Sequence, residues 1–221
     1  MHYFHNRHNL IDSLRRQGVW LIVYLLILAI VAWLCTEVWE KEVFSFDRSF
    51  LLWLHQFATP QLDRVMLFFT ALGDPPTVVT IFLTTSVWLL IKRRYSDAIR
   101  FAIVCAGGII INQEMKLFFA KPRPELWPRL IADPTFSFPS GHAVGSMVVY
   151  GFLAYILAKE LPQFKLYICA IASSLIISIG LSRLYLGVHY PTDIIAGYGI
   201  GFLWLTTCLK LGFSFRRSLD T

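Results

Sequence analysis

Long uncharged apolar runs are the feature that most restricts the fold of this chain. The first covers residues 19–39, and at about 1.5 Å per residue a helix of this length spans roughly 30 Å of hydrocarbon. Its length and the bulky side chains at its end favour a retained membrane anchor over a cleaved signal peptide. Five further spanning segments follow, at about 75–91, 97–119, 142–158, 164–182 and 191–211.

The composition supports a membrane protein. The chain is 56% hydrophobic and only 15% charged, whereas a soluble domain carries about 25% charged residues. The net charge of +6 is typical of cytoplasmic loop lysines and arginines, and we expect no nucleic-acid partner. Each of the four cysteines stands alone in an apolar run without metal-ligand spacing, so they are interpreted as small buried hydrophobes.

These patterns predict an all-α integral membrane protein, a bundle of six transmembrane helices with extra interfacial helices. Residues 1–18 are expected to form a basic cytoplasmic interfacial segment, residues 19–211 the membrane domain, and residues 212–221 a cytoplasmic tail. Residues 40–74 mix apolar and charged side chains at helical spacing. We interpret them as two helices at the membrane surface or entering it shallowly.

The orientation follows from the distribution of lysine and arginine. With the N-terminus in the cytoplasm, most of these residues fall on the cytoplasmic side, while most acidic residues fall on the other. The bias therefore predicts that both termini are cytoplasmic and that the chain resides in the plasma membrane. The same orientation places the polar stretches described next at the extracytoplasmic ends of the helices.

Two polar stretches, residues 138–143 and 182–193, stand at the edges of apolar runs. Hydrocarbon makes polar groups costly, so a membrane protein that keeps them there usually has chemistry to perform. In the first stretch Ser140 precedes a helix whose start leaves free backbone N–H groups, and Gly141 lets a ligand approach closely. We expect an anion site here, beside His142.

The second stretch places His189 one helical turn before Asp193. A carboxylate at that spacing can accept a hydrogen bond from one imidazole nitrogen and leave the other free to attack phosphorus. His142 would then protonate the leaving oxygen and later deprotonate water. Either histidine alone is more often structural, so the hypothesis depends on the pair.

Three cations, Lys116, Arg123 and Arg183, lie at or close to apolar segments on the same predicted face. Pro122 and Pro124 bracket Arg123 and hold the chain extended, which can aim the guanidinium inward. A single such residue more often extends to the lipid headgroups. Three cations converging with two histidines favour a site for a phosphoryl group, whose dispersed charge suits guanidinium forks and an ammonium.

Together these residues resemble the type 2 phosphatidic acid phosphatase (PAP2) superfamily. The three motifs K-x6-R-P, P-S-G-H and S-R-x5-H-x3-D occur in order, as Lys116 to Arg123-Pro124, Pro139-Ser140-Gly141-His142, and Ser182-Arg183 through His189 to Asp193. They cover residues 116–193, and the six-span layout fits nearly the whole chain.

The resemblance implies an enzyme without metal or cofactor that removes phosphate from a membrane lipid through a phosphohistidine. It implies His189 as nucleophile, Asp193 as its orienting carboxylate and His142 as general acid and base. It also implies that the phosphoryl oxygens are held by Lys116, Arg123, Ser140, Gly141 and Arg183, with Pro124, Pro139 and Ser182 in support. The implied partners are the lipid substrate and the bilayer, with no obligate protein partner.

Several alternatives stay open at this point. Similarity to smaller bacterial members favours phosphatidylglycerophosphate as substrate, followed by undecaprenyl pyrophosphate and then by phosphatidic or lysophosphatidic acid. A phosphotransferase acting on lipid A or a sugar phosphate, and a non-catalytic lipid-phosphate binder or flippase, are different classes. Six apolar spans argue against a vanadate-dependent haloperoxidase, which has a similar anion site but is soluble.

Overall fold

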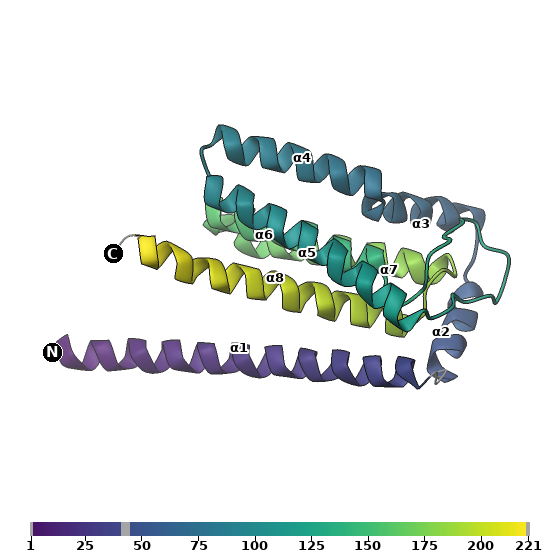
Figure 1. Ribbon diagram of the computed structural model, residues 1–221, viewed down its shortest axis with the longest axis horizontal. Helices are drawn as coiled ribbons and strands as arrows, with labels where there is room; N and C mark the ends of the chain where they lie inside the picture. Colours follow the sequence, from purple (N-terminus) through teal and green to yellow (C-terminus); the bar gives the residue numbers. More distant parts are fainter. Residues whose placement is uncertain (1, 41–44, 220–221) are drawn as a thin grey trace.

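The computed structural model describes residues 2–40 and 45–219, and within these ranges it is helical with no strand. Its helices form an elongated bundle (Figure 1). Their bounds are α1 His2–Trp39, α2 Ser45–His55, α3 Pro60–Gly73, α4 Pro75–Ile91, α5 Tyr95–Phe119, α6 Gly141–Glu160, the 3-10 turn η1 Pro162–Phe164, α7 Lys165–Tyr185 and α8 Pro191–Leu219. The all-α membrane fold expected from the sequence is confirmed.

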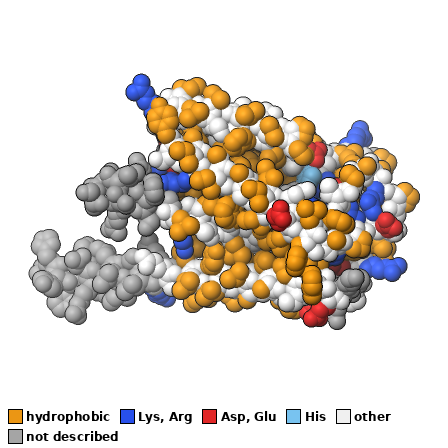
Figure 2. Space-filling view, viewed as in Figure 1, with side chains coloured by type: hydrophobic (Ala, Val, Ile, Leu, Met, Phe, Trp, Pro, Cys, Tyr) orange, Lys and Arg blue, Asp and Glu red, His pale blue; other side chains and the backbone are white. Residues whose placement is uncertain are grey.

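Five of these helices are long and apolar enough to cross a membrane: α1 from Gln17, α5, α6, α7 with η1, and α8 as far as Leu211. Helix α4 has only 17 residues and reaches that standard together with α3, to which it is joined at a bend of 47°. The predicted number of six spans is therefore reached when the bent pair counts as one. Hydrophobic side chains cover the length of the bundle, while lysine and arginine gather mainly at its ends (Figure 2).

Prolines explain the bend between α3 and α4. Pro75 and Pro76 lack the N–H groups that would continue the hydrogen-bond ladder of α3, so one helix ends and another begins. Asp74 sits at the junction in an extended conformation (φ −70°, ψ 150°). Residues 60–73, which the sequence predicted to lie at the membrane surface or to enter it shallowly, thus form a helix that meets α4 at this bend, in the manner of a broken span or a re-entrant loop.

Helix α6 lies at the centre of the bundle and packs against α5, α7 and α8. Its approach to α8 depends on two glycines one turn apart. A Cβ at Gly197 would lie 2.7 Å from that of Ala143, and one at Gly201 would lie 2.8 Å from that of Met147. Small residues at this spacing allow two helices to approach closely. The contact brings the starts of α6 and α8 together, where the Ser140 amide donates to the Asp193 carbonyl at 3.1 Å.

Both chain termini lie at one end of the bundle, and the loop between α5 and α6 lies at the other, next to α2 and α3 (Figure 1). Helix α2 is attached there by Asp47, which is buried and accepts hydrogen bonds from the amide (3.1 Å) and hydroxyl (2.6 Å) of Thr192. A carboxylate at the first turn of a helix satisfies free N–H groups and complements the helix dipole. The fold thereby covers the start of α8, where Asp193 lies.

Candidate active site

A cavity of about 690 Å³ is bordered by the loop between α5 and α6, which lies at the end of the bundle away from the termini (Figure 1). It is bounded by the junction of α3 and α4, the end of α5, the loop after it, the start of α6, the end of α7 and the loop before α8. Six of the residues predicted from the sequence line it together: Lys116, Arg123, Gly141, His142, Arg183 and His189.

The imidazole of His189 is almost fully buried, with 1% of its surface exposed, next to the fully buried Asp193. Its Nδ1 lies 3.4 Å from Asp193 Oδ2, and its Nε2 lies 3.0 Å from the terminal nitrogen Nη1 of Arg123. A guanidinium can only donate, so Nε2 must be the accepting nitrogen and Nδ1 carries the proton. The free electron pair of His189 is therefore on the nitrogen that faces the cations.

Burial lowers the pKa of His189 to about 3. Asp193 acts in the opposite direction, and the positive charges of Arg123 and Arg183 lower the pKa further. The ring is thus neutral at physiological pH, which is the form required of a nucleophile.

The two ends of the loop at residues 120–138 contact Asp193. The loop is closed where the Ser137 amide donates to the Lys121 carbonyl at 2.8 Å. From the same two residues, Lys121 Nζ lies 2.8 Å from Asp193 Oδ1, and the Ser137 hydroxyl donates to Oδ2. The Tyr190 amide adds a hydrogen bond of 2.9 Å. Four donors, counting His189, therefore keep this carboxylate ionised and fixed.

The two arginines converge on Asp133, an acidic residue of the same loop. Arg123 Nη2 lies 2.7 Å from Asp133 Oδ1, and Arg183 Nη2 lies 2.8 Å from Oδ2. Although burial alone would raise it, the two guanidinium charges lower the pKa of Asp133. Lys116 points to the same region, where its Nζ contacts Thr135 Oγ1 at 3.3 Å and the Phe136 carbonyl. Two guanidinium groups thus hold one anion position, and Lys116 contacts the loop residues next to it.

His142, in the first turn of α6, pairs with Asp74 at the break between α3 and α4. The distance from Nε2 to Asp74 Oδ1 is 2.8 Å. The neighbouring Gly73 permits this approach, because a Cβ there would lie 2.7 Å from His142 Cδ2. The proline-induced break therefore brings a carboxylate to the second histidine.

The supporting residues of the motifs fix the ends of helices. Ser140 is fully buried, and its hydroxyl caps α6 by accepting from the Ala143 amide at 3.4 Å. Ser182 donates to the Ile179 carbonyl at 2.6 Å, near the end of α7. The Pro139 carbonyl accepts from the Asn112 side chain at 3.1 Å, and the Pro124 carbonyl from Arg129 at 3.1 Å. The phosphate-binding role expected of Ser140 stays a prediction.

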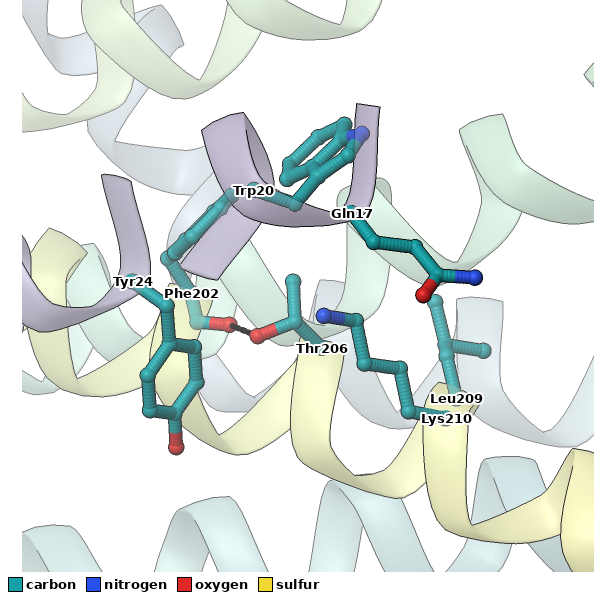
Figure 3. Close-up of a pocket in the computed structure, with 7 residues that line it drawn as sticks. All are labelled: Gln17, Trp20, Tyr24, Phe202, Thr206, Leu209 and Lys210. Atoms are coloured by element: carbon teal, nitrogen blue, oxygen red, sulfur yellow. Dashed lines mark hydrogen bonds between the residues drawn. The ribbon is translucent and has the colours of Figure 1, made fainter. Parts of the chain in front are cut away.

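A second hollow, of about 500 Å³, lies between α1 and α8 (Figure 3). Tyr24 and Trp20 border it on α1, and on α8 Thr206 donates to the Phe202 carbonyl at 2.7 Å. Among the residues whose side chains are described, its lining contains one charged side chain, Lys210, and no histidine or carboxylate. Both histidines predicted from the sequence line the first cavity instead.

A protein-family model described as the PAP2 superfamily matches residues 97–217, more than half of the chain and all three motifs. The chain belongs to the PAP2 superfamily.

Relatives of this PAP2 protein are phosphatases of lipids. Phosphatidylglycerophosphatase B of Bacillus subtilis is 32% identical over 147 residues, 65% of this chain and 72% of the relative. Undecaprenyl-diphosphatase of Sulfolobus acidocaldarius is 29% identical over 195 residues, 85% and 88% of the two chains. The crystal structure of a transmembrane PAP2-type phosphatidylglycerolphosphate phosphatase from Bacillus subtilis matches with a TM-score of 0.80 and 26% identity, covering 86% of this chain and 96% of the other.

Three charged residues at this PAP2 site were not predicted from the sequence: Asp74, Lys121 and Asp133. Each contacts a motif residue at least 50 positions away in the chain. The Asp74-Pro75-Pro76 break was a signal for the first, since a carboxylate at a proline-marked helix end is available to a partner. Spacing within the sequence gave no signal for the other two.

Proposed function

We propose that this PAP2 phosphatase hydrolyses the terminal phosphate of a membrane lipid through a phosphohistidine on His189. The observation that carries the proposal is the environment of His189 Nε2. That nitrogen is unprotonated, lies 3.0 Å from Arg123, and shares one cavity with Lys116, Arg183 and a second histidine. A nucleophile beside positive charges matches the needs of phosphoryl transfer.

In the first step, His189 Nε2 forms a bond to phosphorus while the bond from phosphorus to the lipid oxygen breaks. Protonated His142 donates its proton to that oxygen, which leaves as the alcohol or phosphate of the product lipid. Asp74 accepts from Nε2 of His142 when that nitrogen carries a proton and so orients the ring. Asp193 stabilises the positive charge that develops on His189.

In the second step, His142 removes a proton from water, whose oxygen attacks phosphorus. The bond from phosphorus to Nε2 breaks, and inorganic phosphate leaves with His189 neutral again. Through both steps Lys116, Arg123 and Arg183, with the backbone at Ser140 and Gly141, would hold the phosphoryl oxygens, on which negative charge accumulates.

Phosphatidylglycerophosphate is the proposed substrate, with phosphatidylglycerol as the product. The relative phosphatidylglycerophosphatase B and the TM-score of 0.80 to a phosphatidylglycerolphosphate phosphatase support it. Undecaprenyl pyrophosphate is the second candidate, because undecaprenyl-diphosphatase aligns with a larger share of this chain, 85%. Phosphate release from these two lipids and from phosphatidic acid, measured side by side in detergent without added metal, distinguishes the candidates.

His189→Ala tests whether the protein is a catalyst. We expect complete loss of phosphate release with the helical content unchanged. Persistent release from the folded variant would refute the mechanism, and no release from any of these lipids by the natural protein would favour a binder or flippase. Activity lost with EDTA and restored by a divalent cation would also contradict the proposal.

We also propose that both termini and the segments 1–18 and 212–221 are cytoplasmic and that the cavity opens toward the extracytoplasmic side. The termini share one end of the bundle, and the loop between α5 and α6, which borders the cavity, lies at the other (Figure 1). The lysine and arginine bias sets the direction. Cys169 is exposed, contrary to the buried position expected from the sequence, so the test uses a variant in which it is replaced by serine. In that variant, a membrane-impermeant maleimide should label Glu125→Cys in intact cells and Lys92→Cys only after permeabilisation. The reverse pattern would invert the orientation.

A further inference from the structure

Asp133 places a carboxylate between Arg123 and Arg183, two of the cations proposed to bind phosphate. Asp133 bridges Arg123 and Arg183 through its two oxygens, at 2.7 and 2.8 Å. The arginine side chains are only 5% and 2% exposed, whereas that of Asp133 is 19% exposed. Desolvated guanidinium groups hold an anion strongly, so this position is occupied by an anion from the chain itself.

The fit of Asp133 to this position is incomplete. Within the described part of the chain, the Nε of Arg183 is buried and has no hydrogen-bond partner. A buried donor left without an acceptor is costly. A carboxylate offers two oxygens, while a phosphoryl group offers three, and the third could accept from this nitrogen. The unpaired donor therefore points to a ligand larger than the carboxylate.

Asp133 can leave without dismantling the site. The loop is held at its base by Lys121 and Ser137, which both contact Asp193. The further contacts of Asp133 are short-range, to the amide and hydroxyl of Thr135 at 3.4 and 3.0 Å. Displacement of Asp133 would thus move the tip of the loop and leave the His189–Asp193 pair in place.

We propose that Asp133 is an internal counter-anion that occupies the phosphoryl position between turnovers and returns to it when inorganic phosphate leaves. The inference rests on the proposed function and adds a role in product release. A dianionic phosphoryl group displaces a monoanionic carboxylate because its larger negative charge is attracted more strongly by the three cations of the cavity. A tethered carboxylate, however, competes at an effective concentration of the order of millimolar, which weakens the binding of the phosphate product.

The test is the affinity for inorganic phosphate, measured by titration calorimetry in detergent without any lipid, for the natural protein and Asp133→Asn. If Asp133 competes with phosphate, the variant binds phosphate at least about tenfold more tightly, and the inhibition constant of phosphate in turnover falls in parallel. If Asp133 merely positions the arginines, the variant binds phosphate more weakly. Unchanged or weaker binding would overturn the inference.

Two matched variants sharpen the result. Glu125→Gln removes an acidic charge from the same loop, but its side chain is 88% exposed and contacts only Arg129, at 3.8 Å, among the ion pairs described. It should bind phosphate as the natural protein does. Asp133→Glu retains the charge and should return the affinity toward the natural value. If Asp133→Asn cannot be purified as folded protein, Asp133→Ser replaces it, because it removes the same charge. The same increase in phosphate affinity is then expected of Asp133→Ser.

Calorimetry needs no turnover, so the two proposals fail separately. Tighter phosphate binding by Asp133→Asn without hydrolysis of any lipid would contradict the phosphatase mechanism alone. Lipid hydrolysis with unchanged phosphate affinity would contradict the counter-anion alone.

Discussion

Replacement of Asp193 by asparagine should remove most of the turnover while the fold persists. One oxygen of Asp193 accepts from Lys121 at 2.8 Å, and the other lies near His189 Nδ1 (3.4 Å) and the Tyr190 amide (2.9 Å). Asparagine has the same shape, but its amide nitrogen must replace one oxygen. Because lysine and the backbone amide can only donate, either orientation places a donor against a donor.

The two orientations damage the nucleophile in different ways. With the amide nitrogen toward His189, the imidazole proton shifts to Nε2, which then cannot attack and opposes Arg123 at 3.0 Å. With the amide nitrogen toward Lys121, the tautomer of His189 is unchanged, but the negative charge that stabilises the histidine is lost. By analogy with the aspartate of a serine-protease triad, we expect a loss of about 10³- to 10⁴-fold, or about 4 to 5.5 kcal/mol of barrier.

The assay is phosphate release from the preferred lipid in mixed micelles, with Asp47→Asn as matched control. Asp47 is also buried and lies 3.8 Å from Lys121, but its hydrogen bonds are to Thr192 at the start of α8. Its loss should lower stability by about 1–3 kcal/mol and leave most of the turnover. Folded Asp193→Asn that keeps more than about a tenth of natural turnover would refute the tautomer argument.

Three further predictions follow from the same geometry. The turnover of His142→Ala should be about 10²- to 10⁴-fold lower than that of the natural protein with a lipid substrate. With p-nitrophenyl phosphate, whose leaving group needs no proton, the loss of turnover should be far smaller. Equal losses with the two substrates would argue against His142 as general acid. Because the pKa of His189 is lowered to about 3, its nucleophilic form is lost only as the pH falls through that value. The rate at which His142→Ala forms a phosphoenzyme from p-nitrophenyl phosphate should therefore be constant between about pH 5 and 8. A fall in this rate near pH 6.5, the ordinary histidine value, would contradict the prediction. Gly73→Ala should reduce turnover because its Cβ would lie 2.7 Å from His142 Cδ2, while Gly18→Ala, which has open space, should not; equal turnover of the two variants would show that His142 tolerates displacement.

The spans and the motif residues were predictable because their signals are local. Apolar length predicted the spans within α1, α5, α6, α7 and α8 to within three residues at each end, since hydrocarbon thickness sets the length of a span. Spacing placed His189 and Asp193 one helical turn apart, and the structure pairs them at 3.4 Å. The bend of α3 against α4 was not predicted, because two prolines mark a break but not whether the second helix continues the span.

The partners of the motif residues could not be predicted, because tertiary packing brings them together. Asp74 meets His142 across 68 positions, and Lys121 meets Asp193 across 72. A charge exposed in one arrangement of helices is buried in another, so sequence alone gives such residues no preferred partner. In the sequence Asp133 was simply an acid in a loop of unknown conformation.

The division between predicted and unpredicted residues has a physical basis. Except for Arg123, the cations and histidines of the motifs lie at helix ends or in the tight turn before α8, where backbone hydrogen bonds fix them. The carboxylates that contact His142 and the arginines are placed differently. Asp74 caps α3 and α4 and is hydrogen-bonded to both through its backbone, whereas Asp133 lies in the irregular loop between α5 and α6. Phosphoryl chemistry needs the first group rigid, since charge stabilisation depends on preorganised positions. In the counter-anion proposal, ligand entry and phosphate release need Asp133 to move, because an anion can enter a desolvated cationic site only as another anion leaves it.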